Sequence, residues 1–185
     1  MVYILLGTGF EEAEALVTAD VLRRAELPAA LAGIGGDIVT GSHGIAVRAD
    51  LPVGRVVLED GDMVVLPGGM GGVASIEGSG EAMALIRRAA EAPGVWLAAI
   101  CAAPTLLARA GLLPKGVPCV CYPGMEGELK KAGAVPAMDC PAVREGKLIT
   151  GKGPGTAFDF ALALVEALAG MDAAEQVRAG LHYGA

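Results

Sequence analysis

The sequence predicts an α/β fold in which a mostly parallel central sheet is covered by helices on both faces. Short apolar runs such as 2–6 and 63–66 alternate with longer stretches of helical periodicity. Strands that are apolar on both faces and separated by helices are typical of a doubly covered parallel sheet. The chain has 185 residues, 54% of them hydrophobic, which suffices for one domain with a substantial core. We therefore expect a single domain over residues 1–185.

Each expected element is an apolar run that ends at turn-forming residues. The run Val2–Leu6 ends at Gly7-Thr8-Gly9, and the run 63–66 ends at Pro67-Gly68-Gly69. Because crossovers between parallel strands are right-handed, the carboxyl ends of the strands meet at one edge, where such sheets bind ligands. The loops of interest are therefore 7–14, 67–73, 101–105 and 151–156. We expect strands at 2–6, 29–34, 38–40, 45–48, 63–66, 95–100 and 147–150, and helices at 11–25, 81–92, 103–110 and 156–168.

Charge and composition exclude several classes of protein. The formal net charge is −7, from 21 acidic and 14 basic residues, which excludes a basic nucleic-acid surface and argues against an anionic membrane as partner. No apolar run reaches the roughly 18 residues of a membrane helix, and the first residues lack the basic start of a signal peptide. Four cysteines without such a signal predict free thiols and a cytoplasmic location.

Two glycine-rich segments resemble phosphate-binding loops but fail chemically. In the segment Gly7–Glu12, Glu12 replaces the third glycine of a dinucleotide fingerprint, and carboxylates fill the helix start where a pyrophosphate would lie. In the segment Gly146–Gly153, Gly153 stands where a P-loop carries Ser or Thr. Neither of the two histidines lies near a cysteine at metal-ligand spacing. We expect no cofactor and no metal.

Cys101 is the strongest candidate for a reactive residue. It follows the apolar run 95–100 and precedes Ala102-Ala103-Pro104, where a helix is expected to begin. A cysteine between a strand and a helix resembles a nucleophile elbow, and the positive end of the helix dipole favours the thiolate and lowers its pKa. A buried structural cysteine is the alternative, and the pattern alone leaves both possibilities open. The other three cysteines, Cys119, Cys121 and Cys140, are expected to be bystanders.

Five segments in register resemble the ThiJ/PfpI superfamily, specifically its parkinsonism-associated (DJ-one) and bacterial ThiJ-like branch. The resemblance spans nearly the whole chain, and its central motif is the elbow around Cys101. The matching segments are Glu11–Glu14, Asp20–Ala25, Val64–Gly69, Ala99–Thr105 and Gly153–Phe158.

The resemblance implies a flavodoxin-like three-layer sandwich, usually a homodimer, with Cys101 as the reactive cysteine and Glu14 as the carboxyl group beside it. Backbone amides of Gly68, Gly69 and Ala102 would correspond to the donors of an oxyanion hole. Because two adjacent negative charges repel each other, we expect the pair to share one proton, with Glu14 neutral beside a thiolate.

Glu11 and Glu12, by contrast, are expected to be solvated acids that favour the helix dipole. In the expected dimer, the helix around Asp20 is a candidate for the interface, since Arg23 and Arg24 could pair with acids across a two-fold axis.

Several positions depart from the family pattern. Ala102 stands where the PfpI-type protease branch has histidine, so a peptidase triad is unsupported. Tyr122 precedes Pro123 where the human member has histidine, while Lys152 and His43 each replace an arginine. These three residues are possible substrate contacts, and for His43 and Lys152 the alternative is a solvated turn residue.

The leading functional hypothesis is a cofactor-independent glyoxalase or deglycase that acts on 1,2-dicarbonyls such as methylglyoxal, or on glycated adducts, in carbonyl and oxidative stress defence. The Cys101 thiolate would add to the aldehyde, and Glu14 would move protons. The rival hypothesis is a redox-sensing stress protein or chaperone regulated by oxidation of Cys101.

Overall fold

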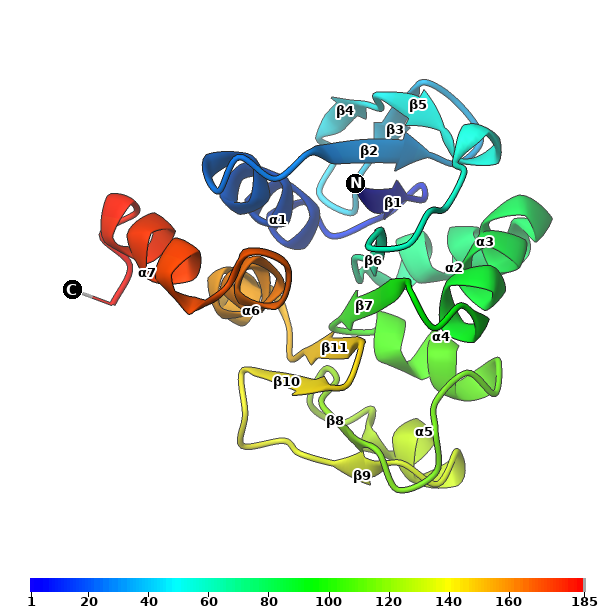
Figure 1. Ribbon diagram of the computed structural model, residues 1–185. Helices are drawn as coiled ribbons and strands as arrows, with labels where there is room; N and C mark the ends of the chain where they lie inside the picture. Colours follow the sequence, from blue (N-terminus) through cyan, green and yellow to red (C-terminus); the bar gives the residue numbers. More distant parts are fainter. Residues whose placement is uncertain (185) are drawn as a thin grey trace.

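A seven-stranded sheet forms the centre of the computed structural model, which describes residues 1–184. The strand order is β10-β11-β7-β6-β1-β2-β5, and every neighbouring pair is parallel except β10–β11 (Figure 1). Two short pairs, β3–β4 and β8–β9, lie outside this sheet. The strands are β1 Val2–Leu6, β2 Ala29–Gly33, β3 Ile38–Thr40, β4 Ala46–Arg48, β5 Leu51–Pro52, β6 Met63–Leu66, β7 Trp96–Ile100, β8 Pro118–Cys119, β9 Val135–Pro136, β10 Ala142–Glu145 and β11 Leu148–Gly151.

Helices cover the sheet on both faces and make a three-layer sandwich. Figure 1 shows α1 and α6 on one face and α2, α3 and α4 on the other, which confirms the predicted α/β class. Two 3-10 turns occupy Val53–Arg55 and Pro154–Thr156. The helices are α1 Glu12–Arg24, α2 Met70–Gly78, α3 Gly80–Glu91, α4 Ala103–Arg109, α5 Glu126–Lys131, α6 Ala157–Ala169 and α7 Met171–Gly180. In the part of the chain described, no helix has the length and apolar character needed to span a membrane.

The central strands are buried because both of their faces pack against helices. Ile4 of β1, Val64 of β6 and Ala98 of β7 have no exposed surface. The parallel register sets Leu66 beside Ala99 and Gly151 beside Ile100, so β6, β7 and β11 end at the same edge. The loops that follow these strands therefore meet there, as the crossover rule predicts.

Helix α2 was not predicted, and it corrects the loop expected at 67–73. The loop ends at Gly69, and the helix begins at Met70. Three glycines in nine residues conceal the helical pattern, because glycine lowers helix propensity. One of them, Gly72, lies so close to Phe10 that a β-carbon would stand 2.6 Å from the Phe10 Cα. These small residues allow α2 to approach the loop that follows β1.

The two arginines near the end of α1 already have partners. Arg23 pairs with Asp50 at 2.9 Å, and Arg24 pairs with Asp20 at 2.7 Å. Both cations therefore have an acidic partner within the chain itself.

Candidate active site

Cys101 lies in a strained turn between β7 and α4. Its φ of 65° is in the left-handed region, which non-glycine residues rarely adopt and which costs about 1–3 kcal/mol. The turn is held because the Cys101 N–H donates to the Gly151 carbonyl at 3.0 Å, and the Tyr122 N–H donates to the Cys101 carbonyl at 2.8 Å. Pro104 lies in the first turn of α4, as expected. The geometry is that of the nucleophile elbow that the sequence suggested.

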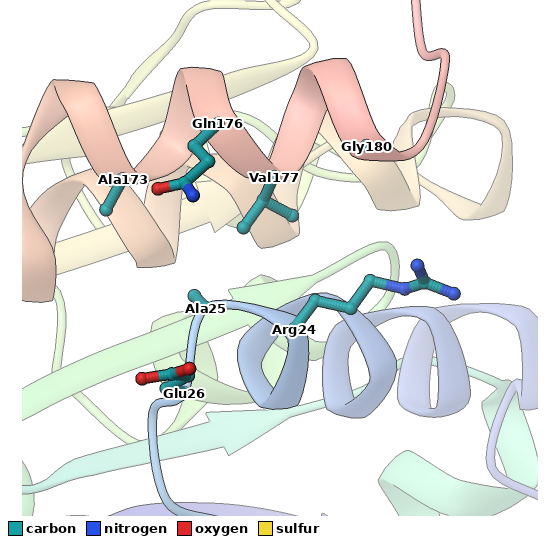
Figure 2. Close-up of a pocket in the computed structure, with 7 residues that line it drawn as sticks. All are labelled: Arg24, Ala25, Glu26, Ala173, Gln176, Val177 and Gly180. Atoms are coloured by element: carbon teal, nitrogen blue, oxygen red, sulfur yellow. The ribbon is translucent and has the colours of Figure 1, made fainter.

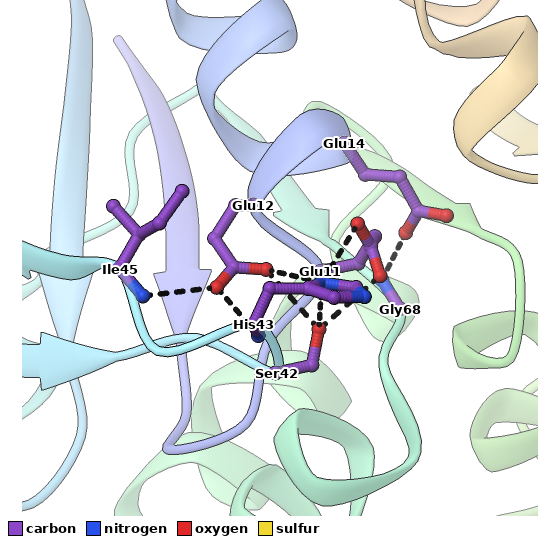
Figure 3. Close-up of polar contacts among 7 residues, drawn as sticks. All are labelled: Glu11, Glu12, Glu14, Ser42, His43, Ile45 and Gly68. Carbon is purple, nitrogen blue, oxygen red and sulfur yellow. Dashed lines mark hydrogen bonds and ion pairs between the residues drawn. The ribbon is translucent and has the colours of Figure 1, made fainter.

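Glu14 reaches this turn from the first turn of α1 and is fully buried. Its Oε2 accepts a hydrogen bond from the Gly68 N–H at 2.6 Å (Figure 3). Its Oε1 is buried and has no hydrogen-bond partner among the described residues. A buried carboxyl oxygen without a partner is energetically costly, which marks Glu14 as a functional candidate rather than a packing residue.

Gly68 is the point at which Cys101 and Glu14 converge. A β-carbon on Gly68 would stand 2.6 Å from the Cys101 Cβ, 2.9 Å from its Sγ and 2.7 Å from the Glu14 Oε2. The predicted role of Gly68 as an oxyanion donor is wrong, because its N–H is already bound to Glu14. Only a residue without a side chain allows the thiol and the carboxyl group to approach from two elements.

Burial and mutual repulsion govern the protonation of the pair. Burial raises the pKa of Glu14 from 4.5 to about 7. Burial, followed by the charge of Glu14, raises the pKa of Cys101 to about 12. The amide at the helix start does act to lower the pKa of Cys101, as expected, but burial and the charge of Glu14 outweigh it, so the net lowering predicted from the sequence is not found. Because the two groups repel each other's charge, they are not both ionised near neutral pH, and the pair holds one proton between them.

Two backbone amides lie against the sulfur. Hydrogen bonds from the N–H groups of Gly69 and Ala102 act to lower the pKa of Cys101, although burial outweighs them. Gly69 has a φ of 81° and immediately precedes α2, while Ala102 immediately precedes α4. Two N–H groups at helix starts thus converge on the Cys101 sulfur, which is the arrangement that an oxyanion site requires.

The three possible substrate contacts lie at different places. The backbone of Tyr122 is bonded to Cys101, and its side chain is 47% exposed. Lys152 follows Gly151, whose carbonyl accepts from Cys101, so Lys152 is also next to the elbow. His43 is exposed, and its imidazole is bonded to Glu12 and Ser42 rather than to the elbow.

Glu12 is the residue whose environment the sequence did not reveal. Expected to be solvated, it is 5% exposed, and its carboxylate is surrounded by donors from Ser42, His43 and Ile45 (Figure 3). Burial acts to raise the pKa of Glu12, but hydrogen bonds from the His43 side chain and from backbone N–H groups lower it to about 2.

Glu11, Glu12 and His43 form the one metal-compatible cluster of the described residues. Their donor atoms lie within 4.8 Å of one another. Each Glu12 oxygen already accepts hydrogen bonds from the protein, so the cluster has a structural explanation without an ion.

A large surface cavity lies away from this chemistry. It has a volume of about 470 Å³ and lies between the carboxyl end of α1 and α7 (Figure 2). Arg24 and Glu26 line it on one side and Gln176 on the other. Glu14 belongs to the opposite end of α1, so this cavity is not part of the site around Cys101.

Comparison with known proteins assigns the chain to a family. A sequence profile of the DJ-1/PfpI family matches residues 1–167. The chain belongs to the DJ-1/PfpI family. Protein dj-1beta of Drosophila melanogaster is 39% identical over 179 residues, covering 96% of this chain and 94% of that protein. The glutathione-independent glyoxalase DJR-1.2 of Caenorhabditis elegans is 34% identical over 162 residues, covering 86% and 83%.

The fold of a DJ-1/PfpI protein agrees with the architecture described above. The crystal structure of Drosophila melanogaster DJ-1beta superposes with a TM-score of 0.90 at 37% identity, covering 100% of this chain and 98% of that one. The predicted membership of the DJ-one branch and the flavodoxin-like sandwich are thereby confirmed.

Proposed function

We propose that this DJ-1/PfpI protein is a cofactor-independent, glyoxalase-type enzyme of carbonyl stress defence that converts small 1,2-dicarbonyls such as methylglyoxal into 2-hydroxy acids. The observation that carries the proposal is the buried Glu14 carboxyl group, with one unpartnered oxygen, beside Cys101 in a strained elbow. The name of the Caenorhabditis elegans relative supports the same activity.

The first step is formation of the carbon–sulfur bond. Glu14 accepts the proton of the Cys101 thiol as the sulfur adds to the aldehyde carbon, which gives a hemithioacetal oxyanion. The pKa of Glu14, about 7, suits a base that operates near neutral pH. The N–H groups of Gly69 and Ala102, which lie against the sulfur, are the donors available to the oxyanion. Glu14 then returns its proton to this oxygen.

The second step moves hydrogen between adjacent carbons. Glu14, again a carboxylate, removes the proton from the former aldehyde carbon and delivers it to the neighbouring carbon through an enediol. The product is a thioester of the 2-hydroxy acid on Cys101. Water hydrolyses this thioester, releases lactate and restores the thiol. One carbon is oxidised and its neighbour is reduced, so the conversion consumes only water and needs no external oxidant.

A methylglyoxal-to-lactate assay tests the proposal. Cys101→Ser is expected to abolish conversion, and Glu14→Ala to reduce kcat by about 10²–10⁴-fold, the usual contribution of a general base. Glu128→Gln, which changes a partly exposed carboxyl group paired with Lys131, serves as the control. Lactate formation that continues unchanged in Cys101→Ser would overturn the proposal. The same assay with glycated peptides as substrate tests whether deglycation is a separate activity.

The second candidate function is redox sensing. The unpartnered Glu14 Oε1 and the amides of Gly69 and Ala102 could hydrogen-bond the oxygens of an oxidised sulfur. Treatment with about two equivalents of peroxide per chain, one for each oxygen atom transferred, should then add two oxygens, about 32 Da, at Cys101. A protein whose Cys101 remains a thiol under this treatment, as read by mass spectrometry, would exclude this function.

We also propose that the chain works as a cytoplasmic homodimer. Ile38 and Ile45, on the β3–β4 hairpin, are 69% and 52% exposed. Large exposed apolar side chains such as these are suited to burial against a second copy. A monomer in sedimentation at micromolar concentration would contradict the proposal.

A further inference from the structure

Glu12 joins two segments that are distant in the sequence. Its Oε1 accepts from the His43 N–H at 2.8 Å and from the Ile45 N–H at 3.3 Å. Its Oε2 lies 3.0 Å from the His43 Nδ1 and 3.1 Å from the Ser42 Oγ. Gly41 packs so tightly on Glu12 that a β-carbon there would overlap its carboxylate. The connection between β3 and β4 is therefore anchored on the first turn of α1 (Figure 3).

The same turn determines where Glu14 points. Glu12 and Glu14 are two residues apart on a helix, so their side chains leave it on nearly opposite sides. Glu12 faces residues 41–45, while Glu14 faces Gly68 and Cys101. A movement of this turn relative to residues 41–45 therefore moves Glu14 relative to the sulfur.

Gly68 completes the link between the helix start and the elbow. Its carbonyl accepts from the Glu11 N–H at 3.0 Å, and its N–H donates to Glu14. Glu11, the residue at the N-cap position, makes no side-chain capping bond to the helix. The first turn of α1 is consequently held by its bonds to Gly68 on one side and by the Glu12 carboxylate on the other, where the Ser42 N–H also donates to the Phe10 carbonyl at 2.8 Å just before the helix.

We propose that Glu12 is a positioning residue, which fixes the first turn of α1 against residues 41–45 and thereby holds Glu14 at the Cys101 sulfur. The proposal rests on the proposed function of the Cys101–Glu14 pair. Glu12 itself does not touch the sulfur; it acts through Glu14. The His43 imidazole and the Glu11 carboxylate are the other titratable groups of the cluster, and both face Glu12 or Ser42.

Two readouts test the proposal on the full chain: the kcat and KM for methylglyoxal, and the rate of alkylation of Cys101 by iodoacetamide as a function of pH, followed by mass spectrometry. Glu12→Ala is expected to lower kcat by about 10- to 100-fold, because a misplacement of about 1 Å has an effect of this size. The KM should change by less than about threefold, since no substrate contact is removed. The pH midpoint for alkylation should fall, because Cys101 would lose the burial and the neighbouring charge that raise its pKa.

A conservative variant separates positioning from charge. Glu12→Gln keeps an oxygen that can accept from both backbone N–H groups, so its kcat should stay within about threefold of wild type and its alkylation midpoint should not move. If Glu12→Ala does not fold, Glu12→Asp takes its place, because a side chain shorter by one carbon cannot reach the donors at 42–45. Glu128→Gln remains the control.

The measured outcomes decide whether Glu12 positions Glu14 or has no such role. A folded Glu12→Ala or Glu12→Asp protein with an unchanged alkylation profile and an unchanged kcat would overturn the positioning role. An equal loss of kcat in Glu12→Gln would also overturn it, since the negative charge of Glu12, and not its hydrogen bonds to residues 42–45, would then matter. If the wild-type protein does not convert methylglyoxal, the proposed function fails, but the alkylation profiles still test Glu12.

Discussion

Replacing Gly68 with alanine would insert a methyl group between the thiol and the carboxyl group of the site. The new β-carbon would stand 2.6 Å from the Cys101 Cβ, about 0.8 Å closer than the 3.4 Å at which ordinary contact begins. The backbone of Gly68 is not in the left-handed region, so the effect is purely steric. Because the clash involves Cys101 and Glu14 together, relaxation must separate them by nearly that amount. We expect kcat/KM for methylglyoxal to fall about 10²-fold.

The same clash should also reduce stability. Overpacking of this kind costs about 1–3 kcal/mol, which lowers the Tm by about 2–4 °C per kcal/mol in a chain of this length. Gly78→Ala is the matched control, because a β-carbon there meets nothing within 4 Å and its φ is also outside the left-handed region. The reasoning is refuted if Gly68→Ala keeps wild-type kcat/KM and Tm, or if Gly78→Ala is damaged equally.

Two further predictions follow from burial. Because the pKa of Glu14 is raised to about 7 in the folded protein from 4.5, its contribution to stability is fully present below pH 4.5 and is lost as the pH rises through 7, a difference of about 3 kcal/mol. Glu14→Gln should therefore raise the Tm above pH 7 but not at pH 4.5, and a Tm difference that is the same at both pH values would contradict this. Cys140 is exposed, whereas Cys119 and Cys121 are buried and burial raises the pKa of each to about 11. A thiol reagent should accordingly label Cys140 in the native protein and the other two only after unfolding; equal labelling rates would disprove the burial.

The sequence predicts well those elements whose burial follows from a local pattern of apolar residues. The apolar runs of β1 and β6 form strands with the predicted ends, because both faces of the central sheet are covered. Strand β10 carries Arg144 and Glu145 and was missed, since an edge strand exposed to solvent needs no apolar run. Helix α2 was missed because its glycines lower the helix propensity of the segment. Two of them, Gly71 and Gly72, allow close packing against the loop after β1.

In the candidate site, too, some features follow from a local sequence pattern and others depend on tertiary contacts. Cys101 stands out because a strand, a cysteine and a helix start follow one another directly, and the structure brings Glu14 to it as the family resemblance implied. The protonation of the pair depends on burial from several elements, which no local pattern reports. Glu12 looked like an ordinary first-turn acid, because the donors that surround it come from residues about thirty positions later. Its environment is a property of the tertiary structure alone.

The hydrogen bonds that hold the elbow form only in the folded chain, so the site is not assembled before folding is complete. Cys101 is fixed through Gly151 and Tyr122, and Glu14 is fixed through Gly68, so each bond joins segments that are far apart in sequence. Such non-local contacts form late, after long loops have closed. A nascent or partly unfolded chain therefore carries a cysteine with ordinary thiol chemistry, without the aligned base and amides. The reactivity proposed for Cys101 and Glu14 therefore requires that the whole carboxyl edge of the sheet has assembled, and it should disappear as soon as that edge opens.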